Sequence, residues 1–220
     1  MLIRKYSLFY IQYILTLLSA ERYCLMNPKI KSILDRIRDL ETELRAELLE
    51  QKKHFKYEMR GKKTIFEKAT KEVHKEVRMN LIKWFRISKP GNILSAPFIY
   101  SLIIPLFILD LFITVYQAVC FRLYGISAVN RSRYIAIDRH RLEYLNLMEK
   151  LNCEFCGYAN GLLAYAVEIA SRTEQYWCPI KHARKDLNSH RRYPYFIEYG
   201  DASDLFNRME ALREELKRSQ

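Results

Sequence analysis

The sequence lacks the short motifs that mark common enzyme sites. It has no glycine-rich phosphate loop, no nucleophile elbow, and no serine, histidine and acidic residues in the chain order of a catalytic triad. Internal repeats and low-complexity segments are also missing. No small-molecule substrate is therefore indicated, and we expect a binding or structural role rather than an enzyme.

The chain also lacks the even cysteine count of a disulfide framework. It has five cysteines, of which Cys24 and Cys120 lie beside apolar segments and are typical of small buried hydrophobes. The other three belong to one motif, described below. A reducing compartment fits this usage better than an oxidising one.

Acidic residues are scarce relative to basic ones, and the imbalance is local. The formal charge is +12, and residues 28–91 hold 18 Lys and Arg against 10 Asp and Glu. A basic helical segment beside an apolar block is attracted to anionic lipid headgroups, at about 1 kcal/mol for each cation near the surface. Nucleic acid is the competing partner, and the adjoining apolar block makes it the less favoured one.

Residues 27–91 are predicted to form a basic, amphipathic helical arm. Apolar residues alternate three and four apart, as a coiled-coil seam requires, and a second stripe follows Gly61. The arm is predicted either to form one long stalk or to fold back as an antiparallel helical hairpin at Gly61, and to self-associate or bind a protein partner. Pro90-Gly91 is predicted to end it. The first stripe is Ile30, Ile33, Ile37, Leu40, Leu44 and Leu48, and the second is Phe66, Ala69, Val73, Val77, Leu81 and Trp84.

Residues 92–124 are predicted to be a membrane segment, since residues 92–121 are apolar apart from Asp110, Gln117 and a few hydroxyl groups. Five cations flank each end, so the charges do not favour either orientation of a single crossing. Three arrangements remain open: a re-entrant hairpin turning near Pro97 or Pro105, a single crossing to about Asp110 followed by an interfacial helix, and a buried helix pair. Asp110 is expected to be a carboxylate at an interface or bend, because no second charge accompanies it in the segment.

The first 26 residues combine a charged start with a short apolar run, as a signal peptide does. Leu18 occupies a position where a cleavage site needs a small residue. A weak signal anchor and a native start at Met26 are the alternatives, and Met26 is favoured.

Residues 125–220 are predicted to form a small helical domain held by a metal ion. Cys153, Cys156, Cys178 and His182 follow the pattern C-x2-C-x21-C-x3-H, which suits a closed tetrahedral zinc site, with iron as the alternative. A helix capped by Asp138 is expected to end at a C-x2-C turn, for which Gly157 supplies a flexible backbone. Further helices are expected over residues 162–169, from Pro179, and from Asp201 or Ser203. The competing interpretations are a redox dithiol at Cys153 and Cys156, and cysteines packed in a helical core.

Three segments of the sequence carry a resemblance to known proteins. They are Arg131-Ser-Arg-Tyr134, Leu151-Asn-Cys-Glu-Phe-Cys-Gly-Tyr-Ala-Asn-Gly161 and Arg172-Thr-Glu-Gln-Tyr-Trp-Cys-Pro-Ile-Lys-His-Ala183. They resemble a family of small, uncharacterised bacterial membrane proteins, over roughly the C-terminal two thirds of the chain. The resemblance implies a bacterial membrane setting, and it implies that the three cysteines and His182 belong to one motif. It implies no activity.

Together these observations predict a mainly α-helical protein at the bacterial inner membrane, with its soluble parts in the cytoplasm. The favoured function is a membrane-anchored scaffold or adaptor with a structural zinc site. The alternative is a membrane-bound redox or electron-transfer protein that uses iron or the cysteine pair.

Overall fold

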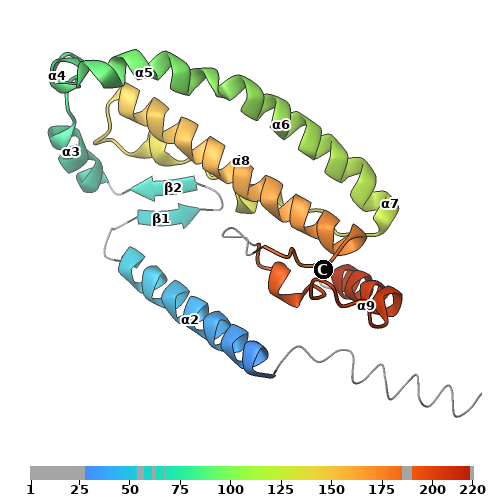
Figure 1. Cartoon of the computed structure of the whole chain (residues 1–220). Helices are drawn as coiled ribbons and strands as arrows, with labels where there is room; N and C mark the ends of the chain where they lie inside the picture. The colour runs from blue at the N-terminus through green and yellow to red at the C-terminus, as the bar shows by residue number, and fades with distance from the viewer. Residues whose placement is uncertain (1–27, 54–56, 61–62, 67, 185–189, 219–220) are drawn as a thin grey trace, which may run out of the picture. The chain divides into compact units, whose positions relative to one another are not determined.

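The computed structural model describes residues 28–53, 57–60, 63–66, 68–184 and 190–218, so the predicted N-terminal extension 1–26 lies outside it. The fold is mainly helical, as predicted (Figure 1). The chain divides into two compact units. Unit 1 comprises Met1–Glu47 and Thr173–Gln220, and unit 2 comprises Leu48–Arg172.

The predicted arm begins as one helix and then changes structure. Helix α2, Pro28–Lys53, contains the first apolar stripe. Strands β1, Tyr57–Arg60, and β2, Lys63–Phe66, then pair antiparallel with Tyr57 opposite Phe66. Helices α3, Lys68–Val77, and α4, Leu81–Ile87, follow. The predicted single second helix is therefore wrong, because β-branched and aromatic residues on both sides of Gly61 favour strands.

The predicted membrane segment forms one helix, Pro90–Tyr124, of 35 residues. It consists of α5, Pro90–Ser101, α6, Ile103–Tyr116, a π-helical turn, Gln117–Phe121, and α7, Arg122–Tyr124. The helical hydrogen bonding changes at Leu102, because Pro105 has no N–H to donate to the carbonyl of Ser101. The chain does not turn back within this helix, so a re-entrant hairpin is not formed.

Helix α8, Leu147–Trp177, is a single 31-residue helix. The predicted turn at Cys153–Cys156 and the separate helix over residues 162–169 are therefore wrong, since Gly157 lies inside α8. The predicted cap at Asp138 is also wrong. Instead Asn146 caps α8, accepting the Glu149 N–H at 3.0 Å while the Glu149 carboxylate accepts the Asn146 N–H at 2.8 Å. These reciprocal bonds form a capping box that fixes the start of the helix.

Within unit 2, α5 and α6 run parallel to α8 (Figure 1). Tyr100 bonds Asn152, Asp110 bonds Tyr158, and Gln117 bonds Tyr165, so contacts advance in the same direction along both helices. The connecting residues 125–146, here called the strap, run back along both. Its start is set by Gly125, which ends α7 in the left-handed region at φ 69°. The buried core of the unit comes from both helices and the strap: Phe121, Ile126, Val129, Leu162, Tyr165 and Ile169.

Unit 1 contains the last helix, α9, Leu205–Arg218, with Leu216 buried. Ile180 and Ile197 form a parallel bridge, and Phe196 and Ile197 are buried. His190 bonds Glu174 near the end of α8 at 2.8 Å, and Gln175 donates to the Leu212 carbonyl of α9 at 2.9 Å. These contacts connect the aromatic and basic segment near residue 190, the end of α8 and the last helix.

Candidate functional site

The four predicted metal ligands lie in two kinds of structure. Cys153 and Cys156 are three apart on α8, with Cys153 half-buried and Cys156 exposed. Cys178 follows the last residue of α8, and its N–H donates to the Glu174 carbonyl at 2.8 Å. The N–H of His182 donates to the Tyr193 hydroxyl at 2.7 Å, and the His182 ring stacks on the Tyr193 ring.

This arrangement does not fit a shared metal ion. Helix α8 is continuous from Cys156 to Trp177, about 20 residues, which at about 1.5 Å per residue span about 30 Å. Ligands of one zinc ion lie about 2.0–2.3 Å from it, and hence about 4 Å from one another. Within the described ranges no three His, Cys, Asp or Glu side chains gather as metal ligands would. Zinc, or iron, at these four residues stays a prediction without support from the geometry, and so does the redox dithiol.

A different polar cluster lies where the apolar helix meets the strap and α8. The Asp110 carboxylate accepts hydrogen bonds from Arg131 at 2.5 and 3.3 Å and from the Tyr158 hydroxyl at 2.9 Å. Only 14% of the Asp110 side chain is exposed, against 46% for Arg131. The charged partner of Asp110 thus comes from the strap, outside the apolar segment.

The Asp110 carboxylate changes the titration of both groups that bond to it. Its hydrogen bond to Arg131 raises the pKa of the guanidinium. Burial, together with the bond to Asp110, raises the pKa of the Tyr158 hydroxyl. At neutral pH Arg131 is therefore charged and Tyr158 keeps its proton, so both remain donors to the carboxylate.

Gln117, the second polar residue of the apolar helix, is also bonded to the strap. Its side-chain carbonyl accepts the Val129 N–H at 2.7 Å, and its amide nitrogen donates to the Tyr165 hydroxyl at 2.9 Å and towards the Val129 carbonyl at 3.4 Å. Gln117, Val129 and Tyr165 are all buried. The side chain thus satisfies backbone groups of an irregular segment that would otherwise be buried without partners.

Two glycines of α8 let the strap approach closely. A Cβ added at Gly161 would lie 2.6 Å from the Tyr134 carbonyl oxygen and 2.9 Å from the Ile135 Cα, and one at Gly157 would lie 3.3 Å from the Ala136 oxygen. The spacing of these glycines, four apart on one helical face, was the available sequence signal for this contact. Gly157 thus makes room for a neighbouring backbone instead of shaping a metal-binding turn.

The outward side of the apolar helix carries exposed apolar side chains, in contrast to the polar contacts on its inner side. Large apolar side chains are more than half exposed along its length, and none of its most apolar 18-residue stretch is buried. This outward stripe consists of Leu94, Phe98, Ile104, Phe107, Leu111, Phe112, Val115, Val119 and Leu123. By length and composition, this helix is able to cross a membrane. It is the clearest functional surface in the described residues.

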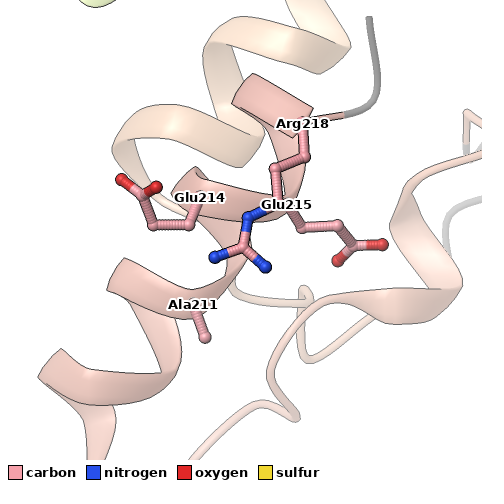
Figure 2. A pocket seen from close by; sticks show the side chains of 4 residues that line it. All are labelled: Ala211, Glu214, Glu215 and Arg218. Atoms are coloured by element: carbon pink, nitrogen blue, oxygen red, sulfur yellow. The ribbon is translucent and has the colours of Figure 1, made fainter.

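A shallow hollow on α9 carries no comparable pattern. It is lined by Ala211, Glu214, Glu215 and Arg218, all from one helix (Figure 2). Glu214 is already paired with Lys217 at 2.8 Å. One exposed helical surface with mixed charges does not enclose a ligand, so we assign no site there.

No family model, curated protein or solved structure matches this chain. The resemblance to bacterial membrane proteins stays a prediction.

Replacing Asp110 by asparagine is expected to lower the free energy of unfolding by about 1–3 kcal/mol, because Arg131 then loses its charged partner in a partly buried position. Chemical unfolding in detergent measures this effect. Asp35→Asn is the matched control, since Asp35 and Arg38 form a 3.9 Å pair on the exposed surface of α2, and it should change stability by less than about 0.5 kcal/mol. Equal effects of the two substitutions would show that the cluster does not hold the strap.

Proposed function

We propose that this protein is a membrane-anchored scaffold that lies on one face of the bilayer, with the outward stripe of α5–α7 inserted among the lipids. The observation that carries the proposal is the contrast between the two sides of this helix. One side is an exposed apolar stripe, and the other is covered by the strap with its exposed arginines. Burial of apolar area favours insertion by about 25 cal/mol for each Å².

The strap argues against a simple crossing. It and α8 accompany the apolar helix from Tyr100 to Gln117, a length of about 25 Å at about 1.5 Å per residue. A helix that crossed the bilayer would carry the strap into the hydrocarbon as well. Arg133, Asp138 and Arg139 are exposed on the strap, and a charge at the bilayer centre costs about 2.5–3.5 kcal/mol. A helix that lies in the plane of the membrane surface, here called an in-plane helix, leaves these charges in water.

The balanced flanking cations support the same arrangement. Five cations precede the apolar helix, four follow it and Arg122 lies in its last turn, and a helix lying in the membrane plane keeps all ten beside the same leaflet. Each contributes about 1 kcal/mol when near an anionic surface. We therefore propose anionic lipid as the membrane partner, and the cytoplasmic leaflet of a bacterial inner membrane as the location. The soluble helices would then be presented to a protein partner.

Labelling from each side of the membrane tests this proposal. Lys89→Cys and Ala128→Cys place single thiols at exposed positions before and after the apolar helix, in a chain whose five native cysteines are replaced by alanine. We expect a membrane-impermeant maleimide to label both positions in inverted vesicles, which expose the cytoplasmic face, and neither position in intact spheroplasts. Labelling from opposite sides would establish a crossing and refute the in-plane helix. Recovery of the protein in the soluble fraction would refute anchoring.

A further inference from the structure

The apolar seam of α2 is exposed along the whole helix. Ile33 and Ile37 are 46% and 48% exposed, and Leu40 and Leu44 are 60% and 59% exposed. Contacts with the rest of unit 1 involve other positions: Arg38 donates to the Tyr195 hydroxyl at 3.0 Å, and Glu41 pairs with Arg191 at 3.4 Å. These contacts leave the seam itself available. Apolar residues at alternating spacings of three and four normally pack against another helix.

The charges at the N-terminal end of α2 oppose its dipole. Residues 28–38 hold four cations and one carboxylate, whereas residues 39–53 hold five carboxylates and three cations, two of which are Lys52 and Lys53 in the last turn. The first turn contains no acidic residue. Cations near a helix N-terminus are unfavourable by about 0.3–1 kcal/mol each, so the isolated helix is destabilised by this order. A neighbouring helix with the opposite order of charges would offset this destabilisation.

We infer that α2 pairs antiparallel with α2 of a second copy of this chain. In an antiparallel pair the basic half of each helix lies beside the acidic half of the other, whereas a parallel pair would place the two basic halves together. The seam also fits: Ile37 of one copy lies opposite Leu40 of the other, and Ile33 lies opposite Leu44. This inference goes beyond membrane anchoring and does not depend on it.

The positions that flank the seam agree with this register. Arg36 of one copy lies beside Glu43 of the other, and Lys29 lies beside Glu50. Twofold symmetry produces each pair twice, so four attractive pairs border the interface. Arg36 and Glu43 are both exposed in the structure and need no rearrangement of the helix to meet.

Disulfide cross-linking of the full chain in detergent tests the orientation. Two differently tagged proteins, one with Ile33→Cys and one with Leu44→Cys, are prepared without native cysteines, mixed and oxidised. We expect mixed dimers at least about fivefold more abundant than either self-linked dimer. Leu49→Cys, on the outer face and 61% exposed, is the control and should not cross-link. Self-linked Ile33→Cys dimers would show a parallel pair and overturn the inference, as would the lack of any link above the control.

Charge reversal supplies a second measurement. Arg36→Glu is expected to raise the dimer dissociation constant about tenfold, measured by sedimentation in the same detergent, because two attractive pairs become repulsive. Adding Glu43→Arg to the same chain should return the dimer dissociation constant to that of the original protein. If the double variant dimerises no better than Arg36→Glu, the register is wrong. Neither measurement uses a membrane, so failure here is distinct from failure of membrane anchoring.

Discussion

Phe107→Asp is expected to weaken binding to vesicles about a hundredfold. Phe107 lies in the outward stripe and is 65% exposed. Insertion of a phenylalanine into an apolar environment contributes about 1.5–3 kcal/mol, and a buried carboxylate adds a cost of up to about 2.5–3.5 kcal/mol. A combined loss of about 3 kcal/mol, which lies within the range of these two contributions, corresponds to about a factor of a hundred. Flotation with vesicles of two parts phosphatidylcholine and one part phosphatidylglycerol measures the change.

Phe206→Asp is the matched control for this substitution. Phe206 lies on α9 and is 83% exposed, so the same change in charge and size is made at an even more exposed site. Vesicle binding should remain within about twofold of the original protein. Equal losses in both variants would mean that any added carboxylate repels the anionic vesicles, and the stripe would then have no special part in binding.

Gly161→Ala is expected to lower the free energy of unfolding by up to about 2 kcal/mol. A methyl group at this position would meet the strap backbone at 2.6 and 2.9 Å, and neither atom belongs to a flexible side chain. Overpacking of this kind typically costs about 1–3 kcal/mol. The better helix propensity of alanine, worth about 1 kcal/mol, offsets only part of that cost. Chemical unfolding in detergent, followed by helical circular dichroism, provides the measurement.

Gly91→Ala is the control for the glycine prediction. Gly91 lies in the first turn of α5, and a Cβ there would meet nothing within 4 Å. The substitution should leave stability unchanged or raise it by up to about 1 kcal/mol. A Gly161→Ala protein as stable as the Gly91→Ala protein would show that the strap moves aside easily.

Periodic features were predictable from the sequence, and contacts between distant segments were not. The seam from Ile30 to Leu48 identified α2, and the apolar run identified the helix of residues 90–124, because repeated spacing determines which face is apolar. The strap has no period, so nothing in its local sequence indicated that Arg131 would reach Asp110, 21 residues earlier. The scarcity of polar residues in the apolar run was the useful clue, since Asp110 and Gln117 both bond the strap.

The turn predicted at Cys153–Cys156 was wrong because the spacing of the two cysteines fits two structures. Two residues between Cys153 and Cys156 suit a metal-binding turn, yet they also place both thiols on one side of a helix. Gly157 seemed to favour the turn. Its spacing from Gly161 carried the opposite information, because two small residues four apart make a groove on a helix that a neighbouring backbone can enter.

The parallel course of the apolar helix and α8 has a consequence for biosynthesis. Asp110 and Gln117 bond Tyr158 and Tyr165, each 48 residues later in the chain. At about 5–20 residues per second, the ribosome adds those tyrosines roughly 2–10 s after the apolar helix has been made. During that interval a carboxylate and an amide wait in an apolar helix without their final partners. The nascent chain must therefore be kept from aggregating, by lipid or by a chaperone, until α8 is long enough to dock.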